Sequence, residues 1–366
     1  MIRLLIVEDS ALMRKLLGRI FADEGDFEVA VARDGIEALA MIATFKPNVV
    51  TLDIHMPGLD GLACLDRIMI EHPCPVVMVS ALTEEGAEET LAALDIGAVD
   101  FITKPGGAIS LEIDALAPLL VEKVRSAATV RVRRSRRLVE RLRGGPREPL
   151  ARPVRVPVPR ERLQRASTVN RAAPSEIEGI VLIGTSTGGP PALDAVLSLL
   201  PGDFPWPVIV VQHMPGSFTG PLARRLNVIC ALDVQEVVAQ TRIEPGNIYI
   251  AKGDADIIVA SRGGRLVCLP TPPDPDRLWH PSVERLVRSA AALVPADNLV
   301  AVLMTGMGND GAPAMAELKQ AGGRTIAEAE ETAIVWGMPG ALVKLGGASV
   351  VVPLERIAET LLEMVP

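Results

Sequence analysis

The chain has 366 residues, more than one ordinary hydrophobic core holds, which predicts two or three domains. Apolar residues make up 49% of it and aromatic residues only 3%, which favours α/β layers of aliphatic side chains over an aromatic-rich β-sandwich. The formal net charge of −8 conceals a basic stretch, residues 123–171, with 15 arginines and one lysine against three glutamates. Because no apolar run reaches the ~18 residues of a membrane helix, we expect no membrane insertion.

The N-terminus turns acidic at Glu8 before any apolar region long enough for a signal peptide. The four cysteines show no CxxC spacing, which is typical of buried free thiols in a reducing compartment. We therefore expect a cytoplasmic protein.

Residues 1–122 alternate strand and helix signals. Short apolar runs lie at residues 4–7, 29–31, 49–52, 76–79 and 99–102, with helical periodicity between them. This alternation predicts a first domain with a doubly wound parallel sheet.

Polar residues follow the strands of this domain where functional groups of a parallel sheet gather, at the carboxyl ends. They are Glu8 and Asp9 after the first strand, Asp53 and Ser80 at the ends of the third and fourth, and Lys104 after the fifth. Three converging carboxylates repel one another unless a cation lies among them, and oxygen ligands suit Mg²⁺. Asp53 then becomes a candidate to accept a phosphoryl group, with Lys104 and Ser80 contacting its oxygens.

The strings VEDS, LDIHMPGLDG, VSA and TKP resemble the motifs of response-regulator receiver domains, which have a flavodoxin-like (βα)5 fold. The resemblance implies phosphorylation of Asp53 by a chemotaxis-type histidine kinase. It also implies Mg²⁺ bound by Glu8, Asp9, Asp53 and the carbonyl of Ile54, and Phe101 as the switch aromatic. His55 stands where the family often has Glu or Asn, which leaves the rate of dephosphorylation open.

Residues 123–175 form a predicted linker, Arg-rich and then Pro-rich. Its first part, from about residue 110 to about 142, has helical character. Because the basic residues are not interleaved with aromatic ones and no zinc-ligand spacing occurs, we favour a solvated linker that touches an acidic surface over specific nucleic-acid binding.

Residues 176–366 resume the α/β alternation and predict a second domain with a doubly wound parallel sheet. Its strand signals lie at residues 180–183, 208–211, 248–250, 257–260, 299–304 and 350–352.

The sequence GTSTGG, residues 184–189, follows the first of these strands and has two interpretations. A phosphate-binding loop needs a following lysine or GxGxxG spacing, and the sequence has neither. The alternative is a GxSxG turn that presents Ser186 as a nucleophile. In that interpretation Gly184 and Gly188 permit the sharp turn and Gly189 leaves room for the substrate.

A serine nucleophile needs a base and a carboxylate that orients the base. His213 follows the next strand and Asp310 follows the strand at 299–304, so three strand ends supply a triad. The chain order Ser, His, Asp differs from that of the α/β-hydrolases, which argues for another α/β sheet.

The strings GTSTGG, QHMP, LMTGMGNDG, HPSVERLVRSA and ETAIVWGMPGA resemble those of the chemotaxis protein-glutamate methylesterases, the CheB family. The resemblance implies hydrolysis of glutamate γ-methyl esters on chemoreceptors to glutamate and methanol, and deamidation of receptor glutamines, with no cofactor for either reaction. It implies Ser186 as nucleophile, His213 as base and Asp310 as its orienting carboxylate. For the oxyanion we expect the backbone N–H groups near Thr187 and Met307.

Trp279-His280 departs from the family pattern before PSV, which leaves the substrate contacts there open. We further expect the unphosphorylated receiver to restrict access to Ser186, and phosphorylation of Asp53 to weaken that packing. Two rival classes are a receiver scaffold without enzymatic activity and a transcriptional regulator, the latter suggested by the arginines.

Overall fold

The computed structural model describes residues 1–104, 109–130 and 177–366. Its N-terminal unit, β1 to α5, holds a parallel sheet of strand order β2-β1-β3-β4-β5. The strands are β1 Ile2–Val7, β2 Phe27–Ala32, β3 Val49–Asp53, β4 Val76–Ser80 and β5 Asp100–Thr103. The helices are α1 Ala11–Asp23, α2 Gly35–Phe45, α3 Gly61–Glu71, α4 Glu84–Ile96 and α5 Ile109–Ala127. The doubly wound fold expected here is confirmed.

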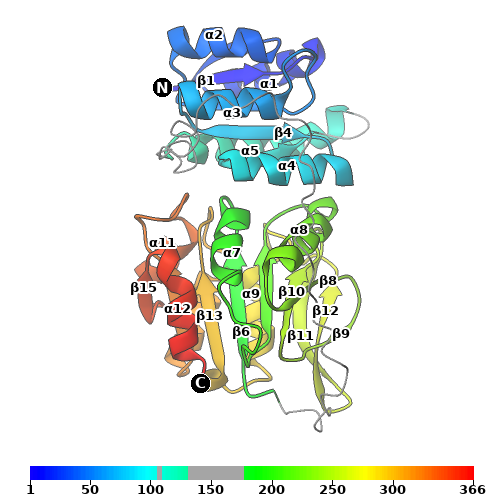
Figure 1. Cartoon of the computed structure of the whole chain (residues 1–366), viewed down its shortest axis with the longest axis vertical. Helices are drawn as coiled ribbons and strands as arrows, with labels where there is room; N and C mark the ends of the chain where they lie inside the picture. Colours follow the sequence, from blue (N-terminus) through cyan, green and yellow to red (C-terminus); the bar gives the residue numbers. More distant parts are fainter. Residues whose placement is uncertain (105–108, 131–176) are drawn as a thin grey trace, which may run out of the picture.

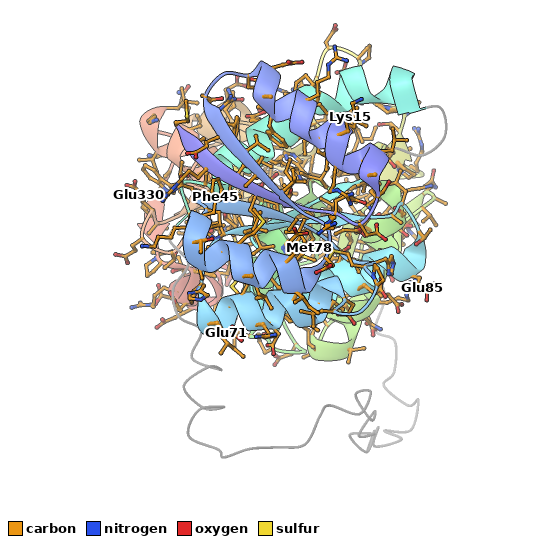
Figure 2. The ribbon with its side chains drawn as sticks, turned by 90° about the horizontal axis from the view of Figure 1, so that it is seen from above. Lys15, Phe45, Glu71, Met78, Glu85 and Glu330 are labelled. Atoms are coloured by element: carbon orange, nitrogen blue, oxygen red, sulfur yellow. The ribbon has the colours of Figure 1, made fainter. Side chains whose placement is uncertain are left out.

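The interior strands β3 and β4 are buried along their whole length, which explains their mostly apolar sequences, VVTLD and VVMVS. Met78 of β4 is fully buried, whereas Lys15, Glu71 and Glu85 lie on the exposed helix faces (Figure 2). Helix α5 ends at Ala127, before the expected limit near residue 142. Residues 131–176, most of the predicted linker, lie outside the described residues.

The C-terminal unit, β6 to α12, is built on a parallel sheet of order β15-β14-β13-β6-β7-β10-β8. Its strands are β6 Ile180–Thr185, β7 Val208–Gln212, β8 Asp233–Val237, β10 Asn247–Ala251, β13 Leu299–Leu303, β14 Arg324–Glu328 and β15 Val350–Val352. Its helices are α7 Gly189–Leu197, α8 Gly216–Ile229, α9 Val283–Ala291, α10 Ala312–Gln320, α11 Met338–Lys344 and α12 Leu354–Met364. The expected parallel α/β sheet is confirmed, and β8 and β14 are strands that the apolar runs did not predict.

One predicted strand lies outside this sheet. Residues 257–260 belong to β11 Asp256–Arg262, which pairs antiparallel with β12 Arg265–Thr271, and β12 pairs in turn with β9 Thr241–Arg242. The reason is local, because Gly263 and Gly264 both take positive φ (57° and 74°) and close a two-residue hairpin.

The N-terminal unit sits over the carboxyl edge of the large sheet, with α4 packed on α8 and α7 (Figure 1). One cluster of buried apolar side chains runs through both units, from Leu91 and Phe101 to Phe218 and Leu222. The two sheets are therefore joined by a continuous apolar contact. Within the described ranges, none of the helices combines the length and the apolar character needed to cross a membrane.

Candidate functional site

The first polar cluster lies at the carboxyl edge of the N-terminal sheet, as predicted. Oxygen atoms of Glu8, Asp9 and Asp53 lie within 4.8 Å of one another. Lys104 Nζ lies 2.7 Å from Asp53 Oδ2 and 3.0 Å from Glu8 Oε2. Glu8 and Asp53 are buried and Asp9 is exposed, so the cluster opens to solvent on one side.

The charges of this cluster perturb one another. Burial, and then the charge of Asp53, raise the pKa of Glu8 above its ordinary value. Burial alone would lower the pKa of Lys104, but its hydrogen bonds to Asp53 and Glu8 and their charges outweigh burial and raise it. A protonated lysine beside the candidate phospho-acceptor attracts the negative oxygens of a phosphoryl group, so Lys104 fits a contact to phosphoryl oxygens.

Three other predicted residues of this cluster point elsewhere in this state. The hydroxyl of Ser80 donates to the carbonyls of Gly86 and Ala81, 3.1 and 3.3 Å away, at the start of α4. The carbonyl of Ile54 accepts the N–H of Gly61 at 2.8 Å. His55 Nε2 lies 3.1 Å from Glu89 Oε2 on α4. The turn after β3 is thus connected to α4, the helix that faces the C-terminal unit.

The second polar cluster lies at the ends of three adjacent strands in the order β13-β6-β7. Ser186 follows β6, His213 follows β7, and Asp310 lies in the loop between β13 and α10. The three predicted triad residues therefore come from neighbouring strands, and all three are buried or nearly so.

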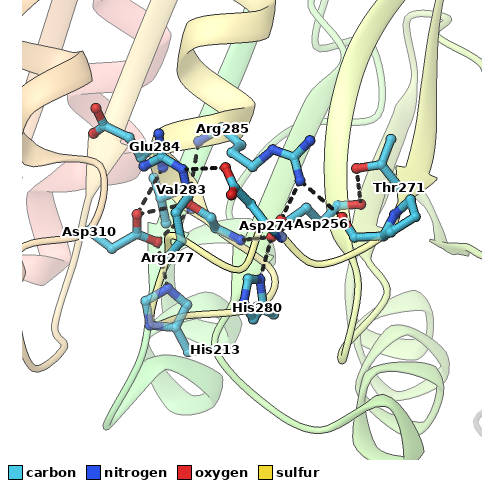
Figure 3. Close-up of polar contacts among 12 residues, drawn as sticks. His213, Asp256, Thr271, Asp274, Arg277, His280, Val283, Glu284, Arg285 and Asp310 are labelled. Carbon is cyan, nitrogen blue, oxygen red and sulfur yellow. Dashed lines mark hydrogen bonds and ion pairs between the residues drawn. The ribbon is translucent and has the colours of Figure 1, made fainter.

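His213 Nε2 lies 2.9 Å from Asp310 Oδ2 (Figure 3). The same carboxylate accepts the backbone N–H groups of Val283 and Glu284 at 2.7 and 3.0 Å and the hydroxyl of Ser282 at 3.0 Å. Burial alone would raise the pKa of Asp310, but the hydrogen bond and charge of His213 and these N–H donors lower it. Asp310 therefore stays ionised and anchors the imidazole to the start of α9, not to its own helix.

The other ring nitrogen of His213, Nδ1, is buried and has no hydrogen-bond partner among the described residues. The Ser186 hydroxyl makes no hydrogen bond to it in this state, and catalytic contacts of this kind often close only around the substrate. Nδ1 is thus the nitrogen left to take the proton of the nucleophile. His280, the histidine of the Trp279-His280 pair, turns its Nδ1 to Asp256 at 3.1 Å and so does not compete for this role.

Free N–H donors lie beside Ser186. The N–H of Ser186 donates to the carbonyl of Thr305 at 2.9 Å and that of Gly306 to Val335 at 2.9 Å. By contrast, the N–H groups of Thr187 and Met307 have no acceptor in the part of the chain that the structure describes. Two unused donors beside a nucleophile fit the geometry of an oxyanion hole.

The turn around Ser186 is held by a glutamine that the sequence did not single out. Gln212 Nε2 donates to the carbonyls of Ser186 and His213 at 2.9 and 3.1 Å, and its Oε1 accepts the Thr185 hydroxyl at 2.5 Å. One side chain therefore fixes the backbones of the candidate nucleophile and the candidate base together. A second such residue is Thr305, whose hydroxyl donates to the carbonyl of Thr187 at 2.8 Å.

The glycines of GTSTGG have partly different roles from those expected. Gly188 turns the chain, with φ 76°. Gly184 makes no such turn, and a Cβ there would lie 2.7 Å from Val283 of α9. A Cβ at Gly189 would lie 1.9 Å from Gln212 Oε1. Gly189 therefore makes room for Gln212 and not for the substrate, because the glutamine must reach the turn from the next strand.

The N-terminal unit touches this turn directly. The hydroxyl of Thr187, the residue after Ser186, donates to Asp100 Oδ2 of β5 at 2.5 Å. Phe101 stacks on Phe218 of α8, with ring centroids 4.5 Å apart. The predicted switch aromatic is therefore part of the contact between the units, and Ser186 lies beneath it, only 5% exposed.

Comparisons with known proteins agree with this arrangement. A sequence model of the CheB methylesterase family matches residues 181–361, and one of the response regulator receiver domain matches residues 4–113. The chain is 55% identical to protein-glutamate methylesterase/protein-glutamine glutaminase 2 of Rhodopseudomonas palustris (strain BisB18), over 99% of this chain and 98% of that protein. It is 54% identical to protein-glutamate methylesterase/protein-glutamine glutaminase 3 of Rhodospirillum rubrum, over 98% of this chain and 95% of that protein. The crystal structure of the Thermotoga maritima CheB methylesterase catalytic domain is 39% identical and covers 51% of this chain and 98% of its own, with a TM-score of 0.49.

Proposed function

Because the chain belongs to the CheB methylesterase family and carries a receiver domain, we propose that it is a phosphorylation-activated protein-glutamate methylesterase. It hydrolyses glutamate γ-methyl esters on chemoreceptors to glutamate and methanol, and deamidates receptor glutamines. The observation that carries this proposal is the pairing of His213 with Asp310 beside the Ser186 turn. The receiver spans residues 1–122 and the esterase residues 176–366, joined by a linker, and the protein works in the cytoplasm.

The first half of the reaction forms an acyl-enzyme. The Ser186 Oγ attacks the ester carbonyl carbon while its proton passes to His213 Nδ1. The ionised Asp310 stabilises the imidazolium that forms, and the N–H groups of Thr187 and Met307 stabilise the negative oxygen of the tetrahedral intermediate. Methanol leaves as its oxygen takes the proton from His213.

The second half regenerates the serine. A water molecule gives a proton to His213 Nδ1 and attacks the acyl carbon, and Ser186 leaves with that proton to release glutamate. A glutamine substrate follows the same steps with ammonia as the leaving group, so one serine serves both reactions.

The test is methanol release from membranes that contain methylated receptors. Replacing Ser186 or His213 by Ala should lower turnover about 10⁴-fold or more, since triad members act as a unit. Ser198→Ala, at the exposed end of α7, is the matched control and should keep full activity. Methanol release that persists in Ser186→Ala contradicts the proposal, and salt-dependent binding to a defined DNA site would favour the transcriptional regulator.

For the receiver we propose that a histidine kinase phosphorylates Asp53. Three carboxylates with oxygen atoms within 4.8 Å of one another are a donor set that suits Mg²⁺, so Glu8, Asp9 and Asp53 would hold the ion. When bound, Mg²⁺ supplies the positive charge that offsets the phosphoryl oxygens. Lys104 holds one of those oxygens, and the Ser80 hydroxyl turns from Gly86 to hold another.

That reorientation reaches the esterase through two elements. The first is α4, which packs on α8 and loses its hydrogen bond from Ser80. The second is β5, whose Asp100 and Phe101 contact Thr187 and Phe218. Phosphorylation thus weakens the contact that covers Ser186. A coupling of ~1–3 kcal/mol corresponds to activation of about 5- to 150-fold.

The activation test compares methanol release with and without a small phosphodonor and Mg²⁺. Wild type should respond and Asp53→Ala should not, while both keep the same unstimulated rate. An equal response in Asp53→Ala would mean that the phosphodonor acts elsewhere, and the gating proposal would then be wrong while the esterase assignment stands.

A further inference from the structure

The imidazole of His213 is covered by an indole. The rings of His213 and Trp279 are parallel to within 3°, with centroids 5.1 Å apart. Trp279 comes from the segment between β12 and α9, 66 positions along the chain from His213, and is half-buried. A Cβ at Gly308 would lie 3.4 Å from Trp279 Nε1, so the glycine-rich loop after β13 supports the edge of the indole.

The imidazole is therefore held from two directions. Asp310 contacts Nε2, and Trp279 stacks on one face of the ring. Of the other charged groups nearby, Glu284 lies behind Asp310, to which its N–H donates, and His280 and Arg285 are turned to Asp256. No cation among the described residues pairs with the Asp310 carboxylate except His213 itself.

This arrangement bears on the moment when His213 carries the proton of Ser186. A cation over the face of an aromatic ring is attracted by the ring quadrupole, and tryptophan gives the strongest attraction. The imidazolium forms in a buried position, where such attraction is larger than in water. The stack also restricts rotation of the ring, so that Nε2 stays on Asp310 and Nδ1 stays free to accept the proton.

We propose that Trp279 is a positioning residue of the esterase, which acts through His213 by holding the ring in its working orientation and by stabilising its protonated form. This rests on the proposed function, since it assigns Trp279 to the same acyl transfer. The sequence Trp279-His280, which departs from the family pattern, then has a role that needs no contact between Trp279 and the substrate. Substrate binding is the alternative role for a half-buried indole at this site.

The experiment uses the full-length chain with phosphodonor and methylated receptor membranes, and compares Trp279→Phe with Trp279→Leu. Trp279→Leu keeps an apolar side chain but removes the aromatic face, so kcat should fall about 10-fold with KM unchanged. Trp279→Phe keeps a weaker face and should recover most of that loss. Leu278→Ala is the control, since that side chain is 78% exposed on the same segment, and it should match wild type.

A second readout needs no receptor. Phenylmethylsulfonyl fluoride sulfonylates an activated serine: the Ser186 Oγ–S bond forms, fluoride leaves, and His213 takes the proton. The rate of this adduct, followed by mass spectrometry, should fall in the order wild type, Trp279→Phe, Trp279→Leu, in parallel with kcat.

A rise in KM with kcat and sulfonylation unchanged would assign Trp279 to substrate binding and overturn the inference. Equal kcat and sulfonylation rates in all variants would overturn it as well. If wild type released no methanol but sulfonylation followed the expected order, the proposed substrate would be wrong and the role of Trp279 would stand.

Discussion

Asp310 illustrates how a single carboxylate serves both folding and chemistry. Its two oxygens accept four hydrogen bonds, from His213, Ser282, Val283 and Glu284. Three of these donors stand at the start of α9, where the unpaired N–H groups and the helix dipole favour a negative charge. The helix therefore fixes the carboxylate, and the carboxylate fixes the imidazole of His213.

A second carboxylate, Glu328 at the end of β14, is fully buried. It accepts the N–H of Thr305 at 2.8 Å and the hydroxyl of Thr332 at 3.1 Å, and the carbonyl of Thr305 accepts the N–H of Ser186. Burial raises the pKa of Glu328 from 4.5 to about 7, although these hydrogen bonds act in the opposite direction.

This raised pKa predicts a pH-dependent stability. The folded pKa lies above the unfolded one, so the stability contribution of neutral Glu328 is fully present below 4.5 and is lost as pH rises through about 7. The loss amounts to roughly 3 kcal/mol, because each unit of pKa difference is about 1.4 kcal/mol. Glu328→Gln mimics the neutral form and should escape the loss.

The measurement is urea unfolding of wild type and Glu328→Gln between about pH 5 and about pH 8. The variant should gain stability relative to wild type as pH rises. Glu330→Gln, an exposed neighbour, is the control and should track wild type throughout. A constant difference between wild type and Glu328→Gln across this range would contradict the prediction.

At the scale of elements, α4 and β5 carry the contact between the two units. Arg225 of α8 forms a bidentate pair with Asp95 of α4 at 2.5 and 2.6 Å, donates to the carbonyl of Leu91, and also pairs with Asp194 of α7. One arginine thus connects the receiver helix to both esterase helices, and it belongs to the same helix, α8, as Phe218 of the Phe101–Phe218 stack.

Loosening this connection should release the esterase in part. Asp95→Asn removes the charge pair but leaves the esterase residues intact. A partly exposed pair of this kind contributes about 0.2–1 kcal/mol, so the unstimulated rate of methanol release should rise up to about 5-fold. The rate with phosphodonor should stay as in wild type, because the contact is already weakened there.

The matched control is Asp23→Asn, which removes an exposed pair with Arg19 on α1, away from the contact. It should leave both rates unchanged. An unstimulated rate for Asp95→Asn that equals wild type would show that the α4–α8 pair does not restrain the esterase.

At the scale of the whole molecule, the receiver carries the proposed phospho-acceptor Asp53 and also contacts the turn that bears Ser186. Deleting residues 1–170 removes Asp100 from Thr187 and Phe101 from Phe218. The truncated chain should release methanol about 5- to 150-fold faster than the unstimulated full-length protein, the range expected of a coupling of ~1–3 kcal/mol. Its rate of methanol release should also be unchanged when phosphodonor is added.

Methanol release and the circular dichroism of the truncated chain check this together. If the truncated chain is folded but releases methanol no faster than the unstimulated full-length protein, the receiver does not inhibit the esterase. Phosphorylation would then activate the esterase through contacts that the receiver supplies. Inhibition by the receiver and activation by the receiver predict opposite changes in the rate of methanol release on truncation, so this comparison distinguishes them.

Much of the molecule was predictable from short strings. Strand ends are marked by a change from apolar to polar residues, so Asp53, Ser186 and His213 were found where β3, β6 and β7 end. The role of Gly189 could not be predicted in this way, because the Gln212 side chain that occupies the space beside it comes from another strand. The hairpin at Gly263 does have a sequence signal, because two adjacent glycines are typical of a tight turn between antiparallel strands.

The sequence by itself determined the two α/β units, the family and the candidate nucleophile, base and phospho-acceptor, because these depend on local periodicity and on residue types at strand ends. Only the tertiary structure decided which groups meet across long separations: Thr187 with Asp100, Phe101 with Phe218, and His213 with Trp279. Such contacts follow from how whole elements pack against one another, and side-chain packing between distant segments leaves no periodic pattern in the chain.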